Sequence, residues 1–364
     1  MTKIERFFRS LRCPIIQAPM AGGFNTPDMV KEVISAGGVG SFGFAYSTSE
    51  LIRTHLHEVL GFRREGPVNA NFFVFTDPII PSVESQELAR QRLCSLSICK
   101  DISISIPSAP YYPDLKTQLE PVWELCPQIL TFHFGLPNES ILREAKFRGI
   151  FVGVTVTSIA DAYEAERRGA DFVIAQGIEA GGHRGLFYSG GTAGDKCNPC
   201  STPPDEQLTT MTLLRRLKGT SSSLRLPVVS AGGIMTNKDV RCFLEAGASA
   251  VQVGTAFLTA LESGTPPTHR RLLLQDPTRG TALTDAYSGR IARGLRSSFA
   301  ETMRGAPLLP FPLQNSLTGP MRKEAARRDD PEHQALWAGS NYAACRSASV
   351  RELMAALCSD LPSR

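Results

Sequence analysis

The sequence predicts an α/β fold: a (β/α)8 TIM barrel that carries a smaller, mainly helical covering segment. Three observations lead to this prediction. Eight short apolar runs occur before residue 262, helical segments alternate with them, and the strand pattern stops beyond Leu261. Alternating strands and helices are typical of parallel βαβ units, and eight such units close a barrel. We therefore expect a barrel over residues 1–261 and a C-terminal covering segment over residues 262–364 that packs on it.

The expected strands are short apolar runs, and the segments between them carry helix signals. Several of these helices begin at an Asn, Ser or Thr residue that can cap the first turn, and they end near a glycine. The strands are expected at residues 14–18, 38–44, 68–75, 129–134, 150–156, 172–175, 227–230 and 250–255. The helices are expected at residues 26–36, 49–60, 138–146, 158–168, 206–218 and 237–245, with a last helix at 349–358.

Two connections are longer than this repeat needs, at about residues 76–128 and 186–204. Each follows a strand, so in a barrel both lie on the face where active sites form. The first contains Tyr111 and Tyr112 among prolines, and these rings are expected either to shape the mouth of a substrate pocket or to pack a lid. The second contains Cys197 and Cys200, which predict no metal site because neither a second pair nor nearby histidines follow.

Composition and charge favour a cytoplasmic globular protein. Of the 364 residues, 42% are hydrophobic and 20% are charged, a balance typical of soluble domains. No apolar run approaches the roughly 18 residues that span a bilayer, and the charged first residues do not resemble a signal peptide. A net charge of +4 without a basic block argues against nucleic-acid binding. Nine scattered cysteines favour reduced thiols over a disulfide framework.

A glycine-rich loop follows the sixth expected strand and holds a histidine. Residues 176–185 read Gln-Gly-Ile-Glu-Ala-Gly-Gly-His-Arg-Gly, with His183 near the end. Glycines leave backbone N–H groups uncovered and permit close approach to a flat or anionic ligand. Histidine is the side chain whose ordinary pKa suits proton transfer near neutral pH. This loop is therefore a candidate active site, and a buried structural histidine is the alternative.

Two small-residue turns predict a phosphate site at the end of the barrel. The turn Ala231-Gly232-Gly233 follows the seventh expected strand, and Gly254-Thr255 lies at the end of the eighth. Barrels commonly bind phosphate there, through exposed backbone N–H groups. The string Gly38-Val-Gly-Ser-Phe-Gly43 matches a dinucleotide motif, but it lies inside a strand-like run, so it fails the structural context of that motif.

A mononucleotide therefore fits these signals better than a dinucleotide. The first strand ends in Gln17-Ala18-Pro19-Met20, Asn71 lies in the third strand and Gln176 ends the sixth. Backbone groups of Ala18 and Met20, with the carboxamides of Asn71 and Gln176, can match the donors and acceptors of a flavin ring.

Other charged residues have simpler interpretations. The series Arg290, Arg293 and Arg296 is expected to form a solvated face, with contact to a phosphate or an anionic substrate as the alternative. His269 and His333 are expected to be solvated.

Several motifs together resemble class I nitronate monooxygenases, the group formerly called 2-nitropropane dioxygenases. The motifs are PIIQAPMAGG, NFFVF, TFHFG, AQGIEAGGHRG, VVSAGGI with VQVGTAFL, and SGRIARGLR with PLQNSLTGP. They cover almost the whole chain, and AQGIEAGGHRG is the most specific of them. The resemblance departs at residues 337–342, which read WAGSNY where the family usually has a WAGQ-type stretch.

The resemblance implies FMN as the cofactor and His183 as the catalytic residue. It also implies that His133 is a second histidine of the active site. With Tyr111 and Tyr112 of the first long connection, His133 is expected to line the substrate pocket. The positions expected to contact FMN are Ala18, Met20, Asn71, Gln176, Gly181, Gly182, Ala231, Gly232, Gly233, Gly254 and Thr255.

The activity that the resemblance implies is oxidation of alkyl nitronates, and of neutral nitroalkanes, by O₂ to carbonyl compounds and nitrite. His183 would remove the α-proton of a neutral nitroalkane, or stabilise the nitronate anion when protonated. The partners would be the small nitronate and O₂, with no nucleic acid and no membrane, and the protein would be a monomer or homodimer. The alternatives are an FMN-dependent NAD(P)H:quinone or enoyl-thioester reductase and a flavin-binding protein without turnover. His183 and Asn71 favour an enzyme over the last of these.

Overall fold

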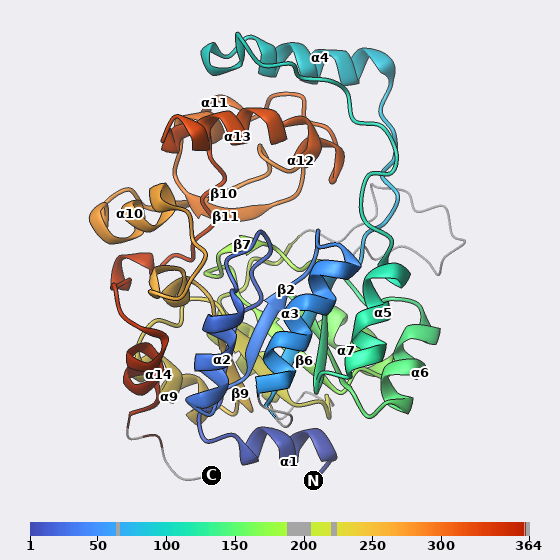
Figure 1. Cartoon of the computed structure of the whole chain (residues 1–364), viewed down its shortest axis with the longest axis vertical. Coiled ribbons are helices and arrows are strands. Elements are labelled where there is room, and N and C mark those ends of the chain that lie inside the picture. Colours follow the sequence, from blue (N-terminus) through green and yellow to red (C-terminus); the bar gives the residue numbers. More distant parts are fainter. Residues whose placement is uncertain (63–65, 188–204, 220–223, 360, 362–364) are drawn as a thin grey trace.

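Eight parallel strands form the centre of the molecule and confirm the predicted barrel (Figure 1). The computed structural model describes residues 1–62, 66–187, 205–219, 224–359 and 361. The strand order is β1-β9-β8-β6-β5-β4-β3-β2, and a parallel bridge between Ile16 and Val39 joins the two outer strands, so the sheet nearly closes. The strands are β1 (Ile15–Gln17), β2 (Gly40–Gly43), β3 (Val68–Phe73), β4 (Ile129–His133), β5 (Phe151–Val156), β6 (Phe172–Gln176), β8 (Val228–Ala231) and β9 (Ala250–Val253).

Helices surround this sheet and agree with the predicted pattern. Side-chain caps explain several starts: Thr26, Ser158 and Thr236 each accept a hydrogen bond from a backbone N–H in the first turn. The helices that follow strands are α2 (Pro27–Ser35), α3 (Ser49–Phe62), α5 (Leu115–Leu125), α6 (Glu139–Phe147), α7 (Ile159–Arg167), α8 (Thr210–Lys218) and α9 (Asn237–Glu245). Helix α5 was not predicted, because Pro121 in its interior conceals the helical signal.

The last helix returns to the barrel. Helix α14 (Val350–Cys358) contacts both α2 and α9 and buries Val350, Leu353, Met354 and Leu357 against the barrel. Figure 1 shows it beside these two helices. The expected covering segment of residues 262–364 thus ends in a helix that belongs to the ring around the sheet, a pairing of distant segments that no local pattern reveals.

The barrel interior is apolar at one end and polar at the other. Helix α1 (Lys3–Ser10) lies across the amino end of the strands (Figure 1), where Phe8 packs edge-on against Phe172 with ring centroids 5.3 Å apart. Towards the carboxyl end, Asn71 Nδ2 donates to Thr131 Oγ1 over 2.9 Å, and Thr131 Oγ1 donates to Asn69 Oδ1 over 2.9 Å. The polar end of the barrel is the end that the covering segment faces.

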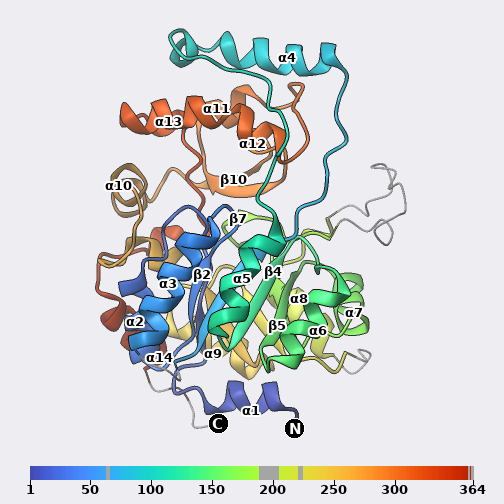
Figure 2. The same ribbon diagram turned by 45° about the vertical axis from the view of Figure 1, so that its right-hand side comes forward.

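The covering segment forms a small antiparallel sheet and a set of helices above the barrel (Figures 1 and 2). Strand β11 (Ala292–Leu295) pairs with β10 (Thr281–Thr284) on one side and with β7 (Gly182–His183) on the other. The loop that holds His183 is therefore the third strand of the covering sheet. The other elements are α10 (Pro267–Gln275), α11 (Ser298–Thr302), α12 (Leu313–Leu317), α13 (Gly319–Arg327) and the short 3₁₀ turns η3 (Thr255–Thr259), η4 (Pro331–His333) and η5 (Tyr342–Ala344).

The first predicted insertion is an arm that joins this covering layer. It carries α4 (Val83–Cys94) and η1 (Ser97–Cys99), and Figures 1 and 2 show α4 lying above α13, far from the barrel. Leu93 and Ile98 of the arm share an apolar cluster with Phe299 and Met321 of the covering segment. Of the second insertion, residues 188–204, including Cys197 and Cys200, lie outside the described residues.

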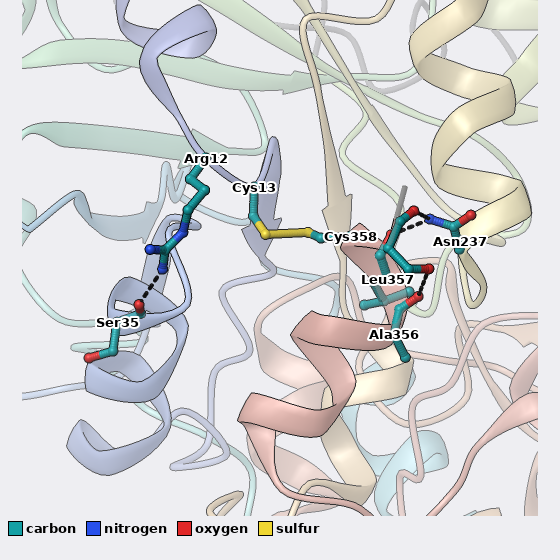
Figure 3. The surroundings of a disulfide bond; sticks show 8 residues. Arg12, Cys13, Ser35, Asn237, Ala356, Leu357 and Cys358 are labelled. Atoms are coloured by element: carbon teal, nitrogen blue, oxygen red, sulfur yellow. Dashed lines mark hydrogen bonds between the residues drawn. A yellow bond between two sulfur atoms is a disulfide. The ribbon is translucent and has the colours of Figure 1, made fainter. Parts of the chain in front are cut away.

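A disulfide joins the first and last parts of the chain. Cys13, just before β1, is bonded to Cys358 at the end of α14, with a Cα–Cα distance of 5.9 Å across 345 residues of sequence (Figure 3). Asn237 fixes the same helix end by donating to Leu357 O over 3.0 Å. The prediction of reduced thiols is wrong for this pair, because the fold brings together two cysteines whose spacing in sequence carries no signal.

Within the described ranges, no helix combines the length and apolar character needed to cross a membrane.

Candidate active site

His183 is held between the barrel and the covering sheet. It lies in β7, in register with Ala292 of β11. Its Nε2 is 2.9 Å from Ser288 Oγ, which donates to Arg290 O over 3.0 Å and accepts from Arg290 N over 3.3 Å. A carbonyl can only accept, so the serine proton is directed to Arg290 O and Ser288 Oγ is an acceptor for His183. The tautomer that satisfies all three contacts has its proton on Nε2 and a lone pair on Nδ1.

Gln176, at the end of β6, fixes the backbone on both sides of His183. Its Nε2 donates to His183 O over 2.9 Å, and its Oε1 accepts from Gly185 N over 2.8 Å. His133, at the end of β4, also contacts His183 O through Nε2 at 3.2 Å. The carboxamide expected to face a flavin therefore also positions the histidine loop.

Arg184, the next residue, ties the same loop to the base of the second insertion. Its side chain is fully buried and makes a two-pronged ion pair with Asp205, at 2.8 and 3.0 Å. Its Nη1 also donates to the carbonyls of Gln176 and Gly177, over 3.0 and 2.7 Å. The guanidinium thus holds Asp205 through Nε and Nη2 and the end of β6 through Nη1.

Both histidines are neutral at physiological pH. Burial, together with the neighbouring His133, Arg290 and Arg322, lowers the pKa of His183 to about 3. Burial, together with Arg290 and Arg184, lowers the pKa of His133 to about 3 against a small opposing effect of its hydrogen bond to His183 O. A neutral His183 with a lone pair on Nδ1 can accept a proton.

Aromatic rings surround His183. Its ring centroid lies 5.4 Å from Trp337, 5.8 Å from Phe311, 5.8 Å from Phe134 and 6.2 Å from Phe73. Phe73 and Phe134 come from the ends of β3 and β4, whereas Phe311 and Trp337 come from the covering segment. Two separate layers therefore supply the walls around one histidine.

The rings continue outward from Phe311. Phe75 is parallel to Phe311 with centroids 5.7 Å apart, and Tyr112 stacks on Phe75 at 4.8 Å. The hydroxyl of Tyr112 donates to Asp77. Tyr111 packs instead against the apolar cluster between the arm and the covering segment. The structure brings Tyr112 into the row of rings that leads to His183 and places Tyr111 beside it, in the packing of the arm.

The expectation of a solvated arginine face is wrong for two of its three members. Arg290 is 6% exposed, lies with its guanidinium carbon 3.7 Å from the centroid of Phe134, and donates to Leu186 O. Arg293 is half-buried and donates to Ile178 O over 2.8 Å. Arg296 is exposed. The two inner arginines are buried because β11 lies directly on the barrel mouth.

His269 is also buried, against the expectation of a solvated side chain. It is 1% exposed on α10, and its ring packs edge-on against Phe24 with centroids 6.0 Å apart. Helix α10 packs against the turns η3 and η5, a placement that its own sequence does not reveal. His333 is half-buried and contacts Asp330 at 2.8 Å.

The two predicted phosphate turns lie next to the histidine loop. Gly232 and Gly233 have φ angles of +121° and +72°, conformations that favour glycine. A Cβ on Gly232 would lie 2.9 Å from Ala180 N, so the turn and the loop approach too closely for a side chain. Gly177 N donates to Ala231 O over 3.0 Å and continues the same contact.

The segment that departs from the family pattern, residues 337–342, lies across these turns. Gly339 N donates to Thr255 Oγ1 over 2.9 Å, and Asn341 Nδ2 donates to Gly233 O over 2.7 Å. A Cβ on Gly181 would lie 2.6 Å from Ala338 C. The changed segment therefore contacts the predicted phosphate site directly.

The remaining expected cofactor positions line the mouth of the barrel. Ala18 N donates to Val253 O over 2.8 Å, and a Cβ on Gly254 would lie 3.3 Å from Ala18 Cβ, so the ends of β1 and β9 are close together. Met20 N donates to Asn25 Oδ1 over 2.5 Å, and Met20 is partly exposed.

Two features fit a bound molecule at this mouth. The buried Gln252 Oε1 accepts no hydrogen bond within the described part of the chain, and Gln252 lies in register between Ile16 and Ala231 of the barrel interior. Gly182 has a φ of +78°, and a Cβ there would meet open space. An acceptor without a protein partner and an open glycine backbone are what a ligand with N–H or O–H donors and an anionic group requires.

Sequence reasoning did not identify several residues of this site. Ser288, Asp205 and Phe311 have no distinctive type or spacing, and Arg184 was noticed only as part of a motif. Three-dimensional proximity defines their roles, since Ser288 lies 105 residues from His183. The available signal was the membership of Ser288 in SGRIARGLR and of Arg184 in AQGIEAGGHRG, and the position of Phe311 directly before PLQNSLTGP. Asp205 lies in none of these motifs.

Comparison with known proteins gives a consistent result. A model of the family described as "Nitronate monooxygenase" matches residues 8–360. The nitronate monooxygenase of Pseudomonas aeruginosa is 35% identical, with 98% of this chain and 99% of the relative covered. A probable nitronate monooxygenase of Bacillus subtilis is 29% identical, with 96% of each chain covered.

Solved structures give the same picture. Nitroalkane oxidase from Streptomyces ansochromogenes superposes with a TM-score of 0.85 at 30% identity, covering 97% of both chains. FabK from Thermotoga maritima superposes with a TM-score of 0.70 at 23% identity, covering 98% of this chain and 95% of that one. The second likeness shows a shared fold.

Proposed function

This chain belongs to the nitronate monooxygenase family, and from that premise we propose that it uses FMN and O₂ to oxidise alkyl nitronates to carbonyl compounds and nitrite. Neutral nitroalkanes are the second substrate class of the proposal. The observation that carries it is a neutral His183, held by Ser288 at Nε2 and by Gln176 at its carbonyl, among aromatic rings at the barrel mouth.

The residues at the barrel mouth fit FMN. Gln252 Oε1 offers a free acceptor within the described residues, and Gly182 offers open backbone in the histidine loop, beside the predicted phosphate turns. The phosphate would be held by Gly181, Gly182, Ala231, Gly232, Gly233, Gly254 and Thr255, and the ring by Ala18, Met20, Asn71 and Gln176. When bound, FMN supplies the electron transfer between substrate and O₂ that no side chain of the chain can provide.

His183 acts on the proton of the substrate. With Nε2–H committed to Ser288, its Nδ1 takes the α-proton from a neutral nitroalkane and produces the nitronate. A substrate supplied as the nitronate has already lost this proton and bypasses the step. Burial, with the nearby charges of Arg290 and Arg322, keeps His183 neutral before the transfer, and the two charges favour the anion that the transfer produces.

The test compares two reactions of the purified protein. We expect a yellow protein that releases nitrite and consumes O₂ when a propyl nitronate is added. Rapid NADH oxidation with a quinone and no nitrite from the nitronate would instead support a reductase. A colourless protein that does not take up added FMN would contradict both activities and support a protein without turnover.

A further inference from the structure

The rings at the barrel mouth differ from the phenylalanines of the core. Phe73, Phe75, Tyr112 and Trp337 remain partly exposed, whereas core rings such as Phe72 are fully buried. Rings that pack only for stability are normally removed from water, and a group of partly exposed rings around a polar centre is typical of a ligand site. The exposed faces of this group are therefore available to a bound molecule.

The ring contacts lead from the outside of the molecule to His183. Tyr112 stacks on Phe75, Phe75 is parallel to Phe311, and Phe311 contacts His183. The interplanar angles of the first two pairs are 2° and 5°. Stacked rings cover each other's faces, so a bound molecule meets the edges and outer faces that remain exposed. A flat ring packs edge-to-face or offset against these better than a flexible alkyl chain does.

The charges near His183 suit an anionic group attached to a flat ring. Arg290 and Arg322 are the cations that act on His183, and Arg290 lies against Phe134, one of the rings that contact the histidine. A flat anionic head group is stabilised near cations, while an apolar ring attached to it is stabilised by the aromatic walls.

We infer that the substrate of this site is an aryl-substituted nitronate, with its nitronate group at His183 and its ring against the exposed parts of the aromatic side chains that lead outward to Tyr112. The inference rests on the proposed function, because it assigns the substrate class of the same site. Each ring contact contributes roughly 0.5–1.5 kcal/mol beyond area burial, which corresponds to about 2- to 12-fold in kcat/KM.

The experiment compares two nitronates of nearly equal size on the FMN-loaded enzyme, those of phenylnitromethane and of cyclohexylnitromethane. The saturated ring buries similar area but has no flat π face. We expect kcat/KM for the phenyl substrate to exceed that for the cyclohexyl substrate by about 2- to 12-fold. Equal values, or a preference for a short alkyl nitronate over both, would overturn the inference while leaving the proposed function intact.

A pair of variants tests whether Phe311 causes the preference for the phenyl substrate. Phe311→Leu keeps an apolar side chain but removes the ring next to His183, so we expect it to bring the phenyl-to-cyclohexyl ratio close to one. The matched control is Phe299→Leu, since Phe299 is also buried in the covering segment but contacts Tyr287 and His333. If Phe299→Leu lowers the phenyl-to-cyclohexyl ratio of kcat/KM as strongly as Phe311→Leu does, the placement of the substrate ring beside Phe311 is contradicted.

A binding measurement does not depend on turnover. Phenylacetate and cyclohexylacetate are stable anions with the same two ring types, and calorimetry on the FMN-loaded protein gives their Kd values. We expect phenylacetate to bind more tightly, and Phe311→Leu to remove the difference. If no nitronate yields nitrite, the proposed function fails. The calorimetric comparison still decides whether the site selects an aryl anion. Equal Kd values for phenylacetate and cyclohexylacetate would reject the inference of an aryl substrate.

Discussion

Replacing Asp205 with alanine should destabilise the protein and loosen the active site together. Asp205 holds both prongs of the Arg184 guanidinium, and the carboxylate and the guanidinium are 4% and 0% exposed. The Asp205→Ala variant leaves a buried cation without its counter-ion, and the carbonyls of Gln176 and Gly177 remain its hydrogen-bond acceptors. The loop that carries His183 would then lose its main anchor to the base of the second insertion.

The size of the effect follows from these contacts. Removing one partner of a buried ion pair costs about 3–5 kcal/mol. Because two carbonyls still accept from Arg184, we expect about 3 kcal/mol, the lower end of that range. Burial by itself would raise the pKa of Asp205, but the hydrogen bonds and charge of Arg184 outweigh it and lower that pKa. The stabilisation is therefore present above the ordinary aspartate pKa and is lost as pH falls through the lowered value.

Urea unfolding at pH 7, followed by circular dichroism, measures this loss, and kcat/KM for a neutral nitroalkane measures the loosening of the loop. The matched control is Glu206→Ala, which removes the exposed neighbouring pair with Arg216 and should change the unfolding midpoint little. Arg184→Met combined with Asp205→Leu removes both charges and should recover much of the stability. Equal unfolding free energies for Asp205→Ala and Glu206→Ala would refute this reasoning.

Three further outcomes are expected. His183→Asn should keep the yellow cofactor but lower turnover of a neutral nitroalkane by roughly 10²–10⁴-fold, with a smaller effect on a preformed nitronate; unchanged turnover would remove His183 from the proton transfer. The pKa values of His133 and His183 are lowered to about 3 in the folded protein, so as the pH falls the unfolded chain binds protons before the folded protein does. The urea midpoint of unfolding should therefore fall as the pH drops below about 6.5. A midpoint independent of pH in this range would contradict neutral histidines. Gly177→Ala would place a Cβ 2.1 Å from Thr210 Oγ1 and should reduce thermal stability and cofactor content. In the control Gly61→Ala, the Cβ meets no atom within 4 Å, and neither property should change. Similar melting temperatures of both variants would show that Thr210 does not pack tightly against Gly177.

Much of the barrel could be predicted because its signals are local. The apolar run that ends at Gln176 and the caps at Thr26 and Thr236 depend on a few neighbouring residues, and the structure has strands and helices at these places. The small-residue turn at Gly232 could be found for the same reason, since its positive φ angle requires glycine whatever lies around it.

The surroundings of His183 could not be predicted in this way. Ser288, which selects its tautomer, and Phe311, which walls it, come from a segment more than 100 residues away. Arg290 was expected to be solvated because a series of arginines on a short segment usually forms a solvated face, and only the pairing of β11 with β7 buries it. The bond between Cys13 and Cys358 has the same origin in long-range packing.

The sequence by itself therefore determined the fold class, the family and the loop that carries the histidine, since periodicity, turn residues and motifs are properties of short stretches. The tertiary structure alone decided the chemistry available at that loop. It set the proton position on His183 through Ser288, removed the charge of the ring by burial among cations, and surrounded it with rings from two layers. These properties depend on distances between segments far apart in the chain, and no local pattern encodes those distances.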